Sequence, residues 1–174
     1  YPTSEPQLQL RLPTERYYEE EGRAELTPRD FGILMHRVFE NAATTDEIYT
    51  TIEAMTQDGV LDEKEAPRLR ELVEKALADP VTAEWFGGRW QVVRNENEII
   101  LPGSGTTRRP DRVMTDGERA VVVDYKFGDR ETARHRKQIR EYLRLLRQMG
   151  YTRTEGYLWY VRLGRTERVE EKED

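Results

Sequence analysis

The chain has 174 residues, of which 36% are charged and 36% hydrophobic, and its formal net charge is −6. It contains no cysteine, which excludes disulfides and cysteine-ligated metal centres. No apolar run approaches the length of a membrane span, so we expect no membrane association and a cytoplasmic location. The length is typical of one domain with its own hydrophobic core.

The N-terminal half is predicted to be helical after an extended start. Residues 1–26 are polar, contain prolines and carry three consecutive glutamates, which is typical of a linker or an extended arm. Thr27-Pro28 then forms a helix start, with a threonine cap and a proline in the first turn. Apolar residues recur at helical spacing over 27–86 and predict three helices, the second ending at Asp58-Gly59 and the third at Asp79-Pro80.

From residue 89 the apolar pattern changes to the two-residue period of strands. Strand candidates cover 90–94, 96–101, 108–115 and 119–126, and a helix covers 133–149. A last strand covers 154–163, and Leu163-Gly164-Arg165-Thr166 is a candidate turn into a short hairpin. This order predicts an α+β fold with a central mixed sheet. We expect one domain over residues 27–170, with a helical segment at 27–86 and a core at 89–163. Residues 171–174 would form an acidic tail outside this domain, and we expect the chain to fray from Glu170.

The most informative stretch is Asp124-Tyr125-Lys126, at the end of the most apolar run in the chain. Because side chains alternate along a strand, Asp124 and Lys126 point to one face and Tyr125 to the other. An acid and a lysine are costly at the end of a buried strand unless they have partners. A second acid, Asp111, lies upstream, and a metal ion held between the two carboxylates would be such a partner. The pattern therefore indicates the chemistry of phosphodiester hydrolysis.

An acid, a gap and then acid-x-lysine resembles the signature of the PD-(D/E)XK nuclease superfamily. Four segments resemble motifs of the RecB-like exonuclease branch of this superfamily. They are the G-x-x-x-H of Gly32–His36, Asn95-Glu96, the D-Y-K of Asp124–Lys126 and the Q-x-x-x-Y of Gln138–Tyr142. The resemblance covers residues 27–163 and points to the nuclease domain at the C-terminal end of UvrD/Rep-type or AddA-type helicase chains. It implies a restriction-endonuclease-like core with an inserted N-terminal helical segment and, since cysteine is absent, no iron–sulfur cluster.

The resemblance also implies a site for Mg²⁺ or Mn²⁺, which suit hard carboxylate ligands. Lys126 would stabilise charge on the attacking water or in the transition state. Gln138 and Tyr142, one helical turn apart, would orient the catalytic groups or touch the DNA strand. The metal-shell residues that the resemblance implies are His36, Glu96, Asp111, Asp124 and, through its backbone carbonyl, Tyr125.

Each of these residues also has a purely structural interpretation. The carboxylates would form ion pairs, Asp111 with Arg109 or Arg112, and Asp124 with Lys126. The histidine would be a partly buried helix residue, the acid of the first strand would be exposed, and the tyrosine of the Q-x-x-x-Y segment would belong to the core.

Positive charge gathers around the predicted site. Residues 108–153 hold thirteen Lys/Arg and seven Asp/Glu, whereas the rest of the chain has a balance of −12. Arg109 lies in this segment, and Arg136, Arg140 and Arg144 repeat every fourth residue and form a basic stripe on the predicted helix. Such a stripe could follow a phosphate backbone. The alternative is a solvated helix face balanced by the acidic tail.

We therefore expect a divalent-metal-dependent deoxyribonuclease of DNA repair or recombination, with exonuclease action favoured over endonuclease action. Its partners would be single-stranded DNA and a helicase domain in the same chain or complex. The alternatives are a catalytically idle domain of the same fold that binds or guides DNA, a dimeric junction resolvase or restriction enzyme, and a protein-interaction module with a coincidental motif.

Overall fold

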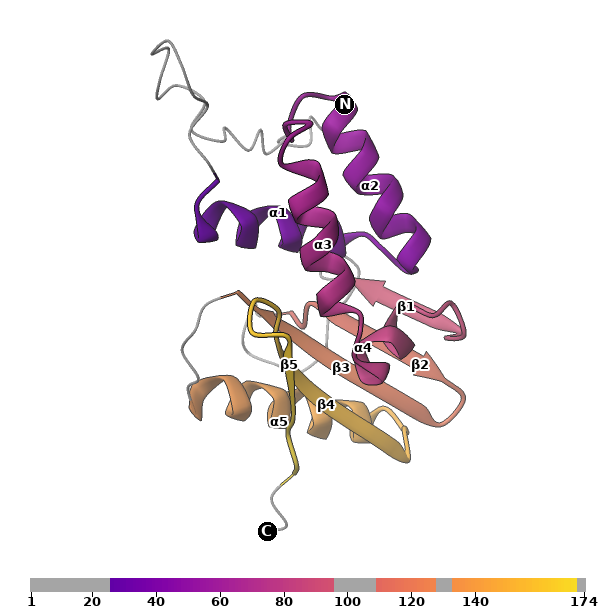
Figure 1. Ribbon diagram of the computed structural model, residues 1–174. Coiled ribbons are helices and arrows are strands. Elements are labelled where there is room, and N and C mark those ends of the chain that lie inside the picture. The colour runs from indigo at the N-terminus through magenta and orange to yellow at the C-terminus, as the bar shows by residue number, and fades with distance from the viewer. Residues whose placement is uncertain (1–25, 96–108, 128–132, 172–174) are drawn as a thin grey trace, which may run out of the picture.

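The computed structural model describes residues 26–95, 109–127 and 133–171. In this part of the chain, five strands form one mixed sheet with helices packed on it (Figure 1), which confirms the α+β fold with a mixed sheet expected from the sequence. The helices are α1 (Pro28–Glu40), α2 (Thr45–Gln57), α3 (Ala66–Ala76), α4 (Pro80–Trp85) and α5 (Ala133–Gln148). The strands are β1 (Val92–Asn95), β2 (Arg112–Asp116), β3 (Arg119–Lys126), β4 (Arg153–Tyr160) and β5 (Arg165–Arg168). None of the described helices has both the length and the apolar character needed to cross a lipid bilayer.

The strands lie side by side in chain order. All neighbouring pairs are antiparallel except β3 and β4, which are parallel. A parallel pair needs a crossover, and α5 forms it. The tight turn between β2 and β3 contains Gly117 at φ 59°, a backbone conformation that glycine adopts without strain. The strand predicted at 96–101 lies outside the described residues.

Alternation along β3 divides the core into two layers. The odd-numbered side chains from Val121 to Tyr125 pack with the cluster formed by α1–α4, whereas Ala120 and Val122 pack with α5. In Figure 1 the first three helices lie above the sheet and α5 crosses below it. Asp124 therefore lies on the face that α5 covers, and Tyr125 lies on the face that the N-terminal helices cover.

The helix starts follow from local capping, and one helix escapes prediction. At α1, the Thr27 hydroxyl accepts the Asp30 N–H at 3.2 Å, and the Asp30 carboxylate accepts the Thr27 N–H at 2.8 Å. The sequence pattern predicts only a helix end at Asp79-Pro80. In the structure the Asp79 carboxylate accepts the Val81 N–H at 2.8 Å, so the same residues begin the short helix α4.

The C-terminal segment is packed further than the sequence predicts. The Val169 N–H donates to the Gly156 carbonyl at 2.8 Å, and the Val169 side chain is buried. Glu171 forms an ion pair of 2.6 Å with Arg147 of α5. We expected the chain to fray from Glu170, and the structure contradicts this for residues 170 and 171. Both residues contact arginines on α5.

The spacing between α5 and the sheet depends on Gly156 in β4. A Cβ atom at this position would overlap the Cγ2 atom of Ile139 and lie 3.3 Å from both terminal methyl groups of Leu143. Only a residue without a side chain allows the helix to approach the strand this closely.

We predict that Gly156→Ala destabilises the domain by about 1–3 kcal/mol, because the added methyl group overpacks the α5–β4 contact. Ile139→Ala leaves a cavity and is destabilising by itself. The double variant should be more stable than the sum of the two single changes, because the smaller side chain makes room for the methyl group. Urea unfolding of the four proteins measures this coupling, and strictly additive effects would contradict the packing described.

Candidate active site

An acid and a lysine lie together at the end of β3. The Lys126 Nζ atom is 2.9 Å from Asp124 Oδ2, and the two side chains are 21% and 6% exposed. The Tyr125 side chain points to the opposite face, where its ring packs against those of Phe39 and Trp159 with centroids 5.9 and 5.6 Å away. The ion pair that the sequence offered as a structural alternative is therefore present, and it leaves the other Asp124 oxygen outside that contact.

Asp111 is brought to the same place from the start of β2. Its Oδ2 atom accepts the backbone N–H of Tyr125 at 2.6 Å. The antiparallel register, in which Arg112 lies opposite Val123, brings the residue before β2 level with the end of β3. The ion pair of Asp111 with Arg112 that the sequence allowed is not formed, because the Arg112 side chain bonds backbone carbonyl groups near the ends of α1 and α4 instead.

The two carboxyl groups perturb each other. The pKa of Asp124 is raised to about 7 by burial, by the negative charge of Asp111 and by a hydrogen bond with it, against the opposing charge of Lys126. Burial also acts to raise the pKa of Asp111, but His36, the Asp124 carboxyl group and the Tyr125 N–H outweigh it and hold that pKa below its usual value. The pair therefore shares one proton near neutral pH, as closely spaced carboxylates do.

Helix α1 adds His36 to this pair. The His36 Nε2 atom is 3.6 Å from Asp111 Oδ1, and the side chain is 35% exposed. Its ring meets that of Phe127 edge-on with centroids 5.8 Å apart. One turn earlier, a Cβ atom at Gly32 would lie 3.1 Å from the Phe127 Cβ atom, so a glycine lets α1 approach the end of β3. This contact gives a physical reason for the glycine four residues before the histidine.

The donors present fit a hard divalent cation. Within the described ranges, no three His, Asp or Glu side chains form a group that could hold a metal ion alone. Mg²⁺ does not require such a group, because it uses one or two carboxylates and takes its other ligands from water and substrate phosphate. A largely buried carboxyl pair that shares a proton is a place where a metal ion could replace that proton and relieve the repulsion. Glu96, a further predicted ligand, lies outside the described residues.

The first turns of α5 lie near the site. Burial first, and then the charges of Lys126, Arg134 and Arg136, lower the pKa of His135 at the start of α5. Further along, the Gln138 Nε2 atom donates to the Tyr142 hydroxyl at 3.0 Å, and the Tyr142 side chain is buried. The two residues of the Q-x-x-x-Y segment thus act as one hydrogen-bonded unit, and their catalytic role stays a prediction.

The basic stripe is largely bound to the C-terminal segment. Arg136 forms an ion pair with Glu167 of β5, and the Arg140 Nε atom donates to the Glu170 carbonyl at 3.2 Å. Arg144 and Arg109 are exposed. Contact of these arginines with nucleic acid remains a prediction. The structure gives Arg136 and Arg140 a role in the fold as well.

Sequence reasoning missed Arg112, which is fully buried between the helices and the sheet. The available signal was its position. Strand alternation sends residue 112 to the face opposite Asp111, toward the N-terminal helices, so a buried environment could have been expected.

We predict a pH effect on stability from Asp124. Its pKa is raised in the folded state, from 3.8 to about 7. The folded protein therefore holds this proton more tightly than the unfolded chain, and the associated stability is lost as the pH rises from about 4 to about 7. The slope is at most about 1.4 kcal/mol per pH unit. Asp111, whose pKa is lowered, contributes stability that is lost only below pH 3.8, outside this window.

Unfolding of the wild type and of Asp124→Asn by urea, in EDTA and across pH 5–8, tests this effect. The asparagine variant should lack this part of the pH dependence and should be the more stable protein at pH 8. Parallel curves for the two proteins would show that Asp124 does not hold the proton.

Comparison with known proteins agrees with the fold. No curated protein matches the chain at a significant level. Residues 7–174 match the PD-(D/E)XK nuclease superfamily, which is nearly the whole chain. The mixed sheet with its flanking helices is consistent with the restriction-endonuclease-like fold of that superfamily. The chain therefore belongs to the PD-(D/E)XK nuclease superfamily.

Proposed function

We propose that this nuclease-superfamily domain is an active, divalent-metal-dependent DNA nuclease. The observation that carries the proposal is the pair formed by the buried Asp124 and the partly buried Asp111, whose carboxyl groups perturb each other's pKa values, with Lys126 2.9 Å from Asp124. Two ionised acids held together destabilise a fold unless a shared proton or a bound metal ion neutralises part of their charge. Hydrolysis of a phosphodiester bond is the reaction that uses such a cation beside a lysine.

We assign each site residue a role in the proposed reaction from its position in the structure. Asp111 and Asp124 would hold Mg²⁺ or Mn²⁺, with His36, Glu96 and the Tyr125 carbonyl as further candidate ligands. When bound, the ion would polarise the scissile phosphate and lower the pKa of the attacking water. Lys126 is held in place by Asp124 and would present its ammonium group to negative charge that develops on the phosphate or on the water.

The finer assignment is a RecB-like exonuclease domain that works with a helicase in DNA repair or recombination. Its support is the order of the motif segments along the chain, with Gly32 and His36 on α1, the D-Y-K segment on β3, and Gln138 and Tyr142 on α5. The chain is acidic overall, so a helicase that delivers single-stranded DNA would explain how a domain of net charge −6 meets a polyanion.

A catalytically idle domain that binds or guides DNA is the second candidate. The same basic segment around residues 108–153 would serve it. Clustered carboxylates oppose it, because acids that face phosphate weaken binding unless a metal ion lies between them. The idle domain would bind DNA equally well with and without divalent ions.

We predict that the purified domain cleaves DNA only when Mg²⁺ or Mn²⁺ is present. Asp124→Ala and Lys126→Ala should each lower the cleavage rate by about 100-fold or more, because they remove a metal ligand and the adjacent cation. The assay uses single- and double-stranded DNA and matching RNA, each labelled at one end. A circular single strand among the substrates separates endonuclease from exonuclease action.

Lys75→Ala is the matched control, because Lys75 is an exposed lysine on α3 in an ion pair with Glu71, far along the chain from the site. It should cut at the wild-type rate. Circular dichroism establishes that every variant is folded. Cleavage that survives EDTA, or wild-type cleavage by folded Asp124→Ala, would exclude the proposed mechanism.

A further inference from the structure

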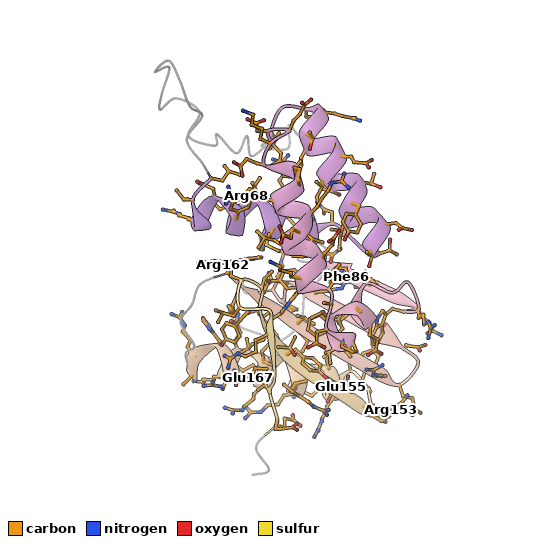
Figure 2. All side chains as sticks on the ribbon, viewed as in Figure 1. Arg68, Phe86, Arg153, Glu155, Arg162 and Glu167 are labelled. Carbon is orange, nitrogen blue, oxygen red and sulfur yellow. The ribbon has the colours of Figure 1, made fainter. Side chains whose placement is uncertain are left out.

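Arg112, the first residue of β2, has an unusual environment. It is fully buried, and its guanidinium group lies over the Phe86 ring at 4.1 Å from the centroid. Figure 2 shows Phe86 at the junction between the helices and the sheet. A buried guanidinium group is costly unless its N–H groups are satisfied, and burial lowers the pKa of Arg112.

The two terminal nitrogens of Arg112 donate to three backbone carbonyl groups and one side chain, whereas its Nε atom is buried without a hydrogen-bond partner among the described residues. One terminal nitrogen, Nη2, donates to the Ala43 carbonyl at 2.9 Å and to the Trp85 carbonyl at 2.8 Å. The other, Nη1, donates to the Ala42 carbonyl and to Asn95 Oδ1, the latter at 3.4 Å. The Trp85 carbonyl lies at the C-terminal end of α4, where carbonyl groups lack partners within the helix and carry partial negative charge that suits a cation. The Ala42 and Ala43 carbonyls lie in the loop between α1 and α2.

These contacts join the elements that carry the candidate site. Ala42 and Ala43 follow α1, the helix that presents His36, and Trp85 ends α4. Asn95 ends β1 and precedes the candidate ligand Glu96. Arg112 itself follows Asp111, whose carboxylate accepts a hydrogen bond from the Tyr125 N–H. One side chain therefore fixes the start of β2 relative to α1, α4 and the end of β1.

We propose that Arg112 is a positioning residue for the nuclease reaction, which sets where Asp111 and His36 stand relative to Asp124. This role rests on the proposed nuclease function. The planar guanidinium fork is what the role requires, because it directs several N–H groups to fixed acceptors at once. Lysine would keep the positive charge but present one ammonium group on a flexible stem. A side chain that only fills the core would not need this geometry.

The test compares Arg112→Lys with Arg119→Lys. Arg119 begins β3, at the opposite end of the strand from the site. Its guanidinium group forms ion pairs with Glu84 of α4 and Glu155 of β4, so it also joins α4 to the sheet. Both variants keep the charge and lose a guanidinium fork that holds α4. The quantities measured are the melting temperature, the dissociation constant for Mn²⁺ by calorimetry, and kcat and KM for an oligonucleotide at saturating Mn²⁺.

Arg112→Lys should weaken Mn²⁺ binding or lower kcat by about 10-fold or more, as changes behind metal ligands do, with KM for DNA little changed. Arg119→Lys should leave both quantities at wild-type values even if its melting temperature falls as far. A folded Arg112→Lys protein with wild-type Mn²⁺ affinity and kcat overturns the proposal and leaves the residue a purely structural role.

If Arg112→Lys does not fold, Asn95→Ala decides the question, because it removes one acceptor and keeps the arginine. It should weaken Mn²⁺ binding by about threefold, the value of one hydrogen bond, and unchanged affinity overturns the proposal. A wild-type domain that neither binds Mn²⁺ nor cuts DNA refutes the nuclease function and this role with it. Wild-type activity beside an unaffected variant refutes only the role of Arg112.

Discussion

Two carboxyl groups that repel each other when ionised, Asp124 buried and Asp111 partly buried, are held side by side, and the arrangement around them follows from that constraint. The Tyr125 N–H fixes Asp111 at 2.6 Å, and Lys126 offsets part of the charge on Asp124 at 2.9 Å. Both stabilising groups come from the same strand end as Asp124 itself. The repulsion therefore cannot be relieved by a side-chain movement alone without breaking a contact. A bound cation would relieve it and leave these contacts in place.

The architecture supplies this rigidity from both sides of the sheet. On one face, the Tyr125 ring is packed among aromatic side chains of α1 and β4, so the backbone that holds Asp111 is fixed by core packing. On the other face, Gly156 lets α5 lie directly on β4, and α5 closes the side on which Asp124 points. The geometry of the candidate site and the stability of the core thus depend on the same residues, and changes in either are expected to be coupled.

The strongest sequence signals were the ones that depend on local physics. The valine run of β3, bounded by Asp116-Gly117, could be predicted because β-branched residues and a tight turn act within a few positions. Helix α4 could not be predicted, because Asp-Pro is equally typical of the end of one helix and of the start of the next. The polar strand β5 has no apolar alternation, so only its turn was visible. The partners of Arg112 and Arg136 depend on contacts between distant segments, which spacing in the sequence does not encode.

The central claim is that the repelling carboxylates form a metal site, and a crystal soaked in Mn²⁺ tests it most directly. Anomalous diffraction locates manganese independently of any assumption about the ligands. The account predicts a peak roughly 2.0–2.3 Å from oxygen atoms of both Asp111 and Asp124, with His36 close by and Lys126 still beside Asp124. Manganese bound elsewhere at saturating concentration, with no peak between the two carboxylates, would contradict it.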